Sequence, residues 1–318
     1  MTNLIFERIP ACVRRIAVVG HVRPDGDCAG SVTAVYRYLR NLYPEREIVP
    51  FLGEYEESLG FLAEGIPVRT DDGEGLFADL CIGLDVSAPE RIGAGSRAFS
   101  EAARTLVIDH HETNPCFGDE NVVCPDASST CEVLYTRMDS GKITQETAVS
   151  LYTGMVHDSG AFRYSCTGPE TLRAAAGLLE KGVPFSRIIE DSMELKSYAV
   201  QKLTAAVLLR SRLYAEEKCL VSDCPLELLD RFEVPLREIG SVVTVLNDTR
   251  EAEVTLFLYE AEPGVWKGSL RSRRDVNVAR LAAVYGGGGH AKAAGFSFAG
   301  DCRDAEEGIL EALRESSH

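Results

Sequence analysis

The sequence has 318 residues, of which 45% are hydrophobic and 26% are charged, and its formal net charge is −16. This composition is typical of globular proteins, and the length allows two domains, each with its own hydrophobic core. A chain this acidic would repel a long polyanion, which argues against binding along long nucleic acids and requires any phosphate to be bound locally.

Three features bear on the compartment. No apolar run approaches the ~20 residues that cross a bilayer, and Glu7, Arg8 and Pro10 interrupt the stretch in which a signal peptide needs an apolar core. The ten cysteines are scattered without a CxxC pair, which favours reduced thiols over disulfides or a thiolate zinc site. We therefore expect a cytoplasmic protein that does not associate with membranes.

The first part of the chain alternates apolar runs with helical patterns. Strands are predicted at 15–20, 47–53, 80–86 and 105–110, and helices at 29–42, 129–141 and 144–160, the last of them capped by Thr144. Strands that alternate with helices predict an α/β domain whose sheet is mainly parallel and covered by helices on both faces.

The second part differs in pattern. A long helical pattern over 190–213 is suited to a connector, and strands are predicted at 219–223, 252–260 and 265–273. A helix that runs into glycines over 277–290 and an amphipathic helix over 304–316 complete the chain. The sequence therefore predicts a first domain over 1–189, a helical linker over 190–213 and a smaller α+β domain over 214–318.

Metal-ligating side chains follow the predicted strands of the first domain. They are His21, Asp25 and Asp27 after the first strand, Asp85 after the third, and Asp109, His110 and His111 at the fourth, while Asp158 follows a helix and precedes another extended segment. Each could be a helix cap, a turn residue or a solvated side chain. Because ligands bind beyond the carboxyl ends of parallel strands, their joint occurrence at that edge favours a functional site.

These residue types favour hard divalent cations. Carboxylates and neutral imidazoles without thiolates suit Mn²⁺ or Mg²⁺, and the histidines favour Mn²⁺. Several anions at one cleft would repel each other strongly unless such ions were bound. There are enough ligands for two ions, and paired ions ~3.5–4 Å apart activate a water and stabilise displacement at phosphorus.

Five segments carry a family resemblance. "GHVRPDGDCAGS", "GLDVSAPERIG", "VIDHH" and "GMVHDSGAFRY" resemble, in order, the four motifs of the DHH phosphoesterase superfamily, and "GSLRSRRDVNVARLAAVYGGGGHAKAAGF" resembles its DHHA1 domain. With two domains and no others, the chain is most similar to the group of nano-RNases and pAp phosphatases. The resemblance implies hydrolysis of short oligoribonucleotides to mononucleotides, and of 3′-phosphoadenosine 5′-phosphate (pAp) to AMP.

The resemblance also assigns roles by position. It implies that His21, Asp25 and Asp85 hold one divalent ion and that Asp27, Asp85, His110 and Asp158 hold the other, with Asp85 bridging; Mn²⁺ is expected, with Mg²⁺ and Co²⁺ as alternatives. His111 matches the histidine that contacts the scissile phosphate and protonates the leaving oxygen. Asp109 matches a supporting residue, and physically it suits a carboxylate that orients an imidazole.

The second domain is expected to bind the substrate. Gly286 to Gly289 leave successive amides free of side chains, which suits an anion-binding nest beside His290, although a helix end with a flexible turn would use the same residues. Arg271 matches the family motif and is the preferred phosphate fork, with Arg273 next. The expected substrate-binding set is Arg271, Arg273, Gly287, Gly288, Gly289 and His290.

Two other functions remain open at this point. One is a stand-alone phosphodiesterase of linear or cyclic dinucleotides, and the other is a nucleotide sensor that binds without cutting. The expected partners are short RNA and pAp, with no long nucleic acid and no membrane. The sequence leaves open the polarity of cleavage and whether the chain forms a homodimer.

Overall fold

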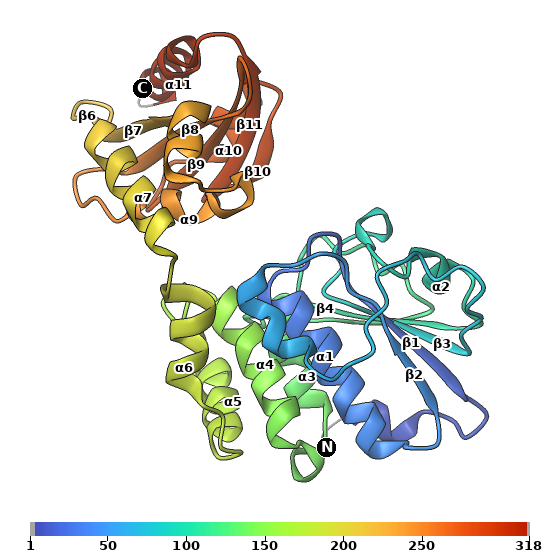
Figure 1. Ribbon diagram of the computed structural model, residues 1–318. Coiled ribbons are helices and arrows are strands. Elements are labelled where there is room, and N and C mark those ends of the chain that lie inside the picture. The colour runs from blue at the N-terminus through green and yellow to red at the C-terminus, as the bar shows by residue number, and fades with distance from the viewer. Residues whose placement is uncertain (1–3, 317–318) are drawn as a thin grey trace. The chain divides into compact units, whose positions relative to one another are not determined.

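The computed structural model describes residues 4–316, which form two compact units (Figure 1). The first unit extends to Leu195 and the second begins at Lys196. Each unit has its own hydrophobic core and its own sheet. Among the described residues, no helix is both long and apolar enough to span a membrane.

The first unit is built on a five-stranded parallel sheet in the order β2-β1-β3-β4-β5. Its strands are β1 (Arg15–Val19), β2 (Glu47–Pro50), β3 (Leu80–Leu84), β4 (Thr105–Asp109) and β5 (Glu120–Val123). The central strands are nearly continuous apolar runs because both faces of the sheet are covered. The four predicted strands are confirmed. The edge strand β5 was not predicted, since it is short and only partly buried.

Helices cover both faces of this sheet, as the sequence predicts. One face packs against α1 (Gly26–Leu42), α3 (Thr130–Arg137) and α4 (Gln145–Asp158), and the other against α2 (Ser96–Ser100). Thr144 caps α4 by accepting a hydrogen bond from the amide of Thr147. The remaining elements of the unit are α5 (Pro169–Leu179), α6 (Phe185–Ile189), η1 (Phe6–Arg8), η2 (Glu57–Ala63), η3 (Pro89–Arg91), η4 (Ser140–Lys142) and η5 (Glu190–Glu194).

Two glycines allow α1, α3 and α4 to pack closely. A Cβ on Gly30 would lie 2.6 Å from the carbonyl oxygen of Ser150 on α4. A Cβ on Gly154 would lie 2.3 Å from Cys131 Sγ and 2.5 Å from Asp27 Oδ1. Because real Cβ atoms do not approach so closely, glycine at these positions lets the carboxylate of Asp27 lie between the helices.

The second unit is built on a six-stranded mixed sheet in the order β10-β11-β9-β8-β7-β6. Its strands are β6 (Arg212–Tyr214), β7 (Cys219–Cys224), β8 (Val254–Glu262), β9 (Val265–Ser272), β10 (Gly288–His290) and β11 (Ala293–Ala299). Core clusters on the two faces include α7 (Tyr198–Arg210), α8 (Leu226–Phe232) and α9 (Gly240–Asn247) on one side, and α10 (Val278–Ala283) and α11 (Cys302–Ser316) on the other; η6 spans Leu236–Glu238. This confirms the α+β class of the second domain.

The pattern over 190–213 does not form one connecting helix. It is divided between η5, α7 and β6, and α7 starts anew after its cap Ser197, whose side chain accepts a hydrogen bond from the amide of Val200. Val200, Leu203 and Val207 are buried in a core cluster of the second unit. Their spacing places them on one helical face, so α7 packs as an integral helix of that unit.

Candidate metal centre

The acids and imidazoles singled out in the first domain gather around the carboxyl ends of β1, β3 and β4. His21 lies just after β1, Asp25 and Asp27 at the start of α1, Asp85 just after β3, Asp109 at the end of β4 followed by His110 and His111, and Asp158 at the last position of α4. The extended segment that the sequence predicts after Asp158 is not present. It forms a tight turn in which Gly160, Ala161 and Phe162 have φ of 57°, 55° and 65°.

Asp85 lies at the centre of this group. Its Oδ2 is 3.4 Å from His21 Nε2, and its Oδ1 is 3.7 Å from both His110 Nε2 and His111 Nδ1. Asp85 is 2% exposed and has a φ of 56°, a left-handed conformation that is uncommon for residues other than glycine. Such strain persists only where the surroundings impose it, which is typical of functional sites.

Asp27 supplies a second, fully buried carboxylate. Its Oδ2 accepts a hydrogen bond from the amide of Thr130 at 2.7 Å, and its Oδ1 accepts one from the amide of Cys131 at 3.0 Å. Ligand atoms of Asp27, His110 and Asp158 lie within 4.8 Å of one another. The first turn of α3 therefore fixes the carboxylate of Asp27 beside two other potential ligands.

Crowding of like charges shows in the carboxyl pKa values. Burial, together with the negative charges of Asp85 and Asp158, raises the pKa of Asp27 well above its usual range. Burial also raises the pKa of Asp158 to about 6, even though its Oδ2 lies 3.1 Å from His110 Nε2. A divalent cation would relieve this repulsion, so the electrostatics of the site fit the ions that its donor atoms prefer.

The ring of His21 is oriented so that one of its nitrogens faces the carboxylates of this group. Its Nδ1 donates to the carbonyl oxygen of Val22 at 2.8 Å, so Nε2 faces Asp25 Oδ1 at 3.6 Å as well as Asp85. Burial lowers the pKa of His21, but its contacts with the two carboxylates outweigh burial and raise that pKa above its ordinary value. An imidazole held by a backbone carbonyl in this way presents its other nitrogen to a metal ion.

His111 is paired with a buried carboxylate. Asp109, which is 0% exposed, accepts hydrogen bonds on Oδ1 from His111 Nδ1 and from the amide of His110, both at 2.8 Å. Asn114 Nδ2 donates to the other oxygen, Oδ2, at 2.6 Å. The hydrogen bond with Asp109 raises the pKa of His111. With Nδ1 used inside the protein, Nε2 of the half-buried His111 is the nitrogen that a ligand can reach.

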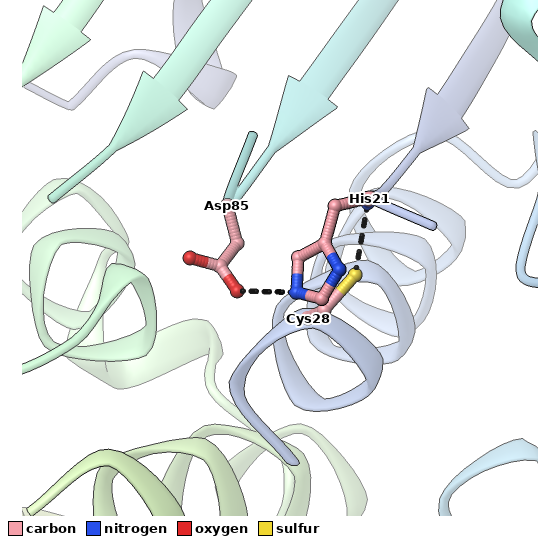
Figure 2. A group of neighbouring side chains, drawn as sticks. All are labelled: His21, Cys28 and Asp85. Carbon is pink, nitrogen blue, oxygen red and sulfur yellow. Dashed lines mark hydrogen bonds and ion pairs between the residues drawn. The ribbon is translucent and has the colours of Figure 1, made fainter. Parts of the chain in front are cut away.

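Sequence reasoning did not single out three residues of this group. Thr130 donates from Oγ1 to Asp85 Oδ1 at 3.2 Å, Asn114 holds Asp109, and the sulfur of Cys28 accepts a hydrogen bond from the amide of His21 at 3.2 Å (Figure 2). Burial raises the pKa of the Cys28 thiol to about 12. Thr130 follows the helix cap Ser129, so its pattern predicts only a helix start, and its contact with Asp85 depends on tertiary packing.

In the second unit, Arg271 and His290 lie on one row of the sheet. Ala293 on β11 pairs with Arg271 on β9 and with His290 on β10. Paired residues of antiparallel strands project to the same face, and the small Ala293 separates the two longer side chains. Arg273 lies beyond the end of β9, and its Nη1 donates to the carbonyl oxygen of Thr249 at 2.8 Å.

The glycine run does not leave four successive amides free, contrary to the nest expected from the sequence. The amides of Gly286 and Gly287 donate to the carbonyl oxygens of Ala283 and Ala282 at the end of α10. Gly288 and Gly289 belong to β10, where a Cβ on Gly289 would lie 2.6 Å from the carbonyl oxygen of Ala293. The first two glycines end a helix, and the next two allow close strand pairing.

A hollow of about 440 Å³ lies next to this row of the second unit. Its lining includes Tyr259, Lys267, Ser269, Tyr285 and the first two glycines of the run, Gly286 and Gly287. Ser269 Oγ accepts a hydrogen bond from Arg271 Nη1 at 3.1 Å, which connects the hollow with the expected phosphate fork. The volume is within the range of small-molecule sites.

Comparison with known proteins identifies both units. Residues 15–155 match the model of the DHH family, N-terminal domain, and residues 216–316 match the model of the DHHA1 domain. A Thermus thermophilus relative, named bifunctional oligoribonuclease and PAP phosphatase NrnA, is 31% identical in an alignment that covers 98% of this chain and 93% of the relative. The chain belongs to the DHH phosphoesterase family. The resemblance drawn from its motifs is confirmed.

Two further comparisons agree with this assignment. A Bacillus subtilis protein of the same name is 29% identical, with 87% of each chain covered. A crystal structure of an exopolyphosphatase-related protein from Bacteroides fragilis superposes with a TM-score of 0.88 at 26% identity, covering 98% of this chain and 93% of the other. The chain is thus a metal-dependent hydrolase of phosphoester bonds, with a candidate metal centre of acidic and histidine side chains.

Proposed function

We propose that this DHH phosphoesterase hydrolyses short oligoribonucleotides to mononucleotides and pAp to AMP. The observation that carries the proposal is the convergence of potential ligands on Asp85, next to the pair formed by Asp109 and His111. The names of the relatives from Thermus thermophilus and Bacillus subtilis, which include both activities, support it.

The proposed cofactors are two divalent ions. Mn²⁺ is preferred over Mg²⁺ because two imidazoles join the carboxylates, and Co²⁺ is an alternative. His21, Asp25 and Asp85 would hold one ion, and Asp27, Asp85, His110 and Asp158 the other. When bound, such ions supply an activated water and offset the negative charge of the phosphoryl group.

The proposed general acid is His111. Asp109 fixes the ring through a hydrogen bond of 2.8 Å to Nδ1, and this contact raises the pKa of His111, which favours the protonated form. His111 would donate the proton on Nε2 to the oxygen that leaves the phosphorus. Asp109 is then the residue that orients and charges this acid, and the hydrogen bond from Asn114 keeps Asp109 in place.

The second unit is proposed to bind the nucleotide. Arg271 would bind a phosphate with His290 on the same row, and the backbone of Gly287, Gly288 and Gly289 would allow close approach, with Arg273 as an outer contact. The acidic chain, with a net charge of −16, disfavours long RNA by repulsion. Its ten free cysteines suit the reducing cytoplasm.

A panel of substrates tests this proposal. Purified protein with Mn²⁺, Mg²⁺ or Co²⁺ is given labelled RNA dimers, a long RNA, pAp, linear pApA and cyclic di-AMP. We expect fast release of mononucleotides from dimers and of AMP from pAp, with the long RNA cut slowly. Rapid cutting of long RNA with dimers untouched would reject the proposal, and turnover of cyclic di-AMP alone would favour a dinucleotide phosphodiesterase.

A further inference from the structure

Cys28 places a sulfur atom at the metal centre. Figure 2 shows the carboxylate of Asp85 pointing to the imidazole of His21, with the sulfur of Cys28 beside the same ring. One ligand atom from each of these three residues lies within 4.8 Å of the other two, and all three residues are buried. Small side-chain movements would allow a single ion to lie about 2.0–2.3 Å from each of the three atoms, the usual length of a metal–ligand bond.

The start of α1 fixes this sulfur in place. Asp25 caps the helix by accepting a hydrogen bond from the amide of Cys28 at 3.1 Å, and the amide of His21 donates to Cys28 Sγ. Cys81 is equally buried, yet it lies in an apolar cluster with Ala17 and Phe99. Cys28 therefore differs from Cys81 in its neighbours and not in its burial, because Cys28 lies beside the potential ligands His21 and Asp85.

Sulfur changes which ions such a group prefers. Oxygen and imidazole ligands accept Mn²⁺ and Mg²⁺, whereas a thiolate favours softer ions, and affinity for nitrogen and sulfur sites rises from Mn²⁺ to Co²⁺ and Zn²⁺. We propose that His21, Cys28 and Asp85 form a binding site for a thiophilic divalent ion, so that Zn²⁺ is held through sulfur and displaces Mn²⁺. On binding, the S–H bond is replaced by a metal–sulfur bond, and the proton passes to water.

Cobalt provides a direct readout. Titration of the metal-free full chain with Co²⁺ should give a near-ultraviolet sulfur-to-cobalt charge-transfer band that saturates with one equivalent. The Cys28→Ser and Cys28→Ala variants should lack this band while still binding Mn²⁺, and the matched control Cys81→Ala should keep it. A native chain without the band, or a band that persists in both Cys28 variants, would overturn the proposal.

Inhibition gives a second readout, which rests on the proposed phosphoesterase activity. In Mn²⁺-supported hydrolysis of pAp, the Zn²⁺ concentration for half inhibition should rise at least about 10- to 100-fold in Cys28→Ala, because loss of a residue that only supports a metal ligand already weakens metal binding by that factor. Equal sensitivity of the variant and the native chain would contradict the proposal. If pAp is not hydrolysed but the cobalt–sulfur band is present, the proposed function fails and the metal site stands.

Discussion

Asp109 Oδ1 accepts a hydrogen bond from His111 Nδ1 at 2.8 Å, while the same carboxylate is held on its other oxygen by Asn114. The two histidines of the motif therefore differ in partner: His110 Nε2 lies 3.1 Å from Asp158, whereas His111 is tied to Asp109. Although the two residues are adjacent, the imidazole of His110 lies among the candidate metal ligands, whereas that of His111 pairs with the supporting carboxylate of Asp109.

The Asp109→Asn variant should lose kcat with little change in KM. General acid catalysis contributes about 10²–10⁴-fold, and the variant should lose a large part of it. Asp109 raises the pKa of His111, and the acid acts in its protonated form, so the alkaline limb of the pH–rate profile should shift to lower pH in the variant. The control is Asp126→Asn, which changes an exposed aspartate and should leave the pH–rate profile unshifted. An unshifted limb would exclude His111 as the acid oriented by Asp109.

Thr130 should act through Asp85. Its hydroxyl donates to Asp85 Oδ1 at 3.2 Å, so Thr130→Val removes a hydrogen bond to a central ligand, and Thr130→Ser keeps it. Loss of such a supporting contact typically weakens metal binding about 10- to 100-fold. Calorimetric titration with Mn²⁺ measures this directly. Equal Mn²⁺ affinities for the Val and Ser variants would show that the hydroxyl has no such role.

Gly154→Ala should damage both stability and the metal centre. The new Cβ would lie 2.3 Å from Cys131 Sγ and 2.5 Å from Asp27 Oδ1, so the helices or the Asp27 carboxylate must move. Overpacking of this kind costs about 1–3 kcal/mol of unfolding free energy. Gly240→Ala, where a Cβ would meet nothing within 4 Å, is the matched control for denaturant unfolding and Mn²⁺ titration. A stable Gly154→Ala variant with native Mn²⁺ affinity would contradict this packing.

Without metal, the folded chain should lose stability as pH rises. Burial lowers the pKa of His110, but Asp158 and neighbouring carboxylates outweigh it and raise the pKa from 6.5 to about 10; the pKa values of His21 and His111 are also raised. When the pKa of a histidine is higher in the folded than in the unfolded chain, its full contribution to the free energy of unfolding is present below the unfolded-state pKa. That contribution decreases as the pH rises from the unfolded-state pKa to the folded-state pKa. Melting temperatures of metal-free protein should therefore fall between pH 6.5 and about 10.

Bound ions should reverse that trend. Mn²⁺ requires deprotonated imidazoles, so its stabilising effect should grow over the same pH range. The comparison is between melting curves with Mn²⁺ and with a chelator. If the metal-free melting temperature is flat across the range, or if Mn²⁺ stabilises less at high pH, the charge arrangement described for the site is wrong.

Arg271→Lys should raise KM for pAp more than it lowers kcat. A lysine keeps the charge but loses the planar fork that binds phosphate through two hydrogen bonds. We expect the loss of one such hydrogen bond to raise KM about tenfold, which corresponds to ~1.4 kcal/mol of binding free energy. Arg274→Lys, which changes an exposed arginine beyond β9, is the control. A KM for pAp that is unchanged in Arg271→Lys would remove Arg271 from the proposed substrate-binding set.

The sequence predicts the parts of the fold that depend on local pattern. The central strands of the first unit are buried on both faces, so they appear as apolar runs, and the acids and imidazoles that follow them fall at one edge because parallel strands all end there. The edge strand β5 lacks such a run, and so its pattern is that of a loop. The prediction of a linker helix over 190–213 was wrong because an apolar helical face has the same pattern in a connecting helix and in a helix that packs within a domain, as α7 does.

The site residues that escaped prediction depend on contacts between distant segments. Thr130 meets Asp85, and Cys28 meets His21 and Asp85, only after α1 and α3 pack beside the sheet. The glycine run carries two local functions in succession, a helix end at Gly286 and close strand pairing at Gly289, which a single motif does not distinguish. Motif spacing identifies ligands, whereas their supporting contacts require the tertiary structure.

Crystals of the full chain soaked in Mn²⁺ and measured at the manganese absorption edge give the sharpest test of the two-ion site. The two-ion site requires two anomalous peaks that share Asp85, one beside His21 and the other beside His110 and Asp158. Density maps without an anomalous peak at Asp85, in crystals whose soaked protein hydrolyses pAp, would contradict it.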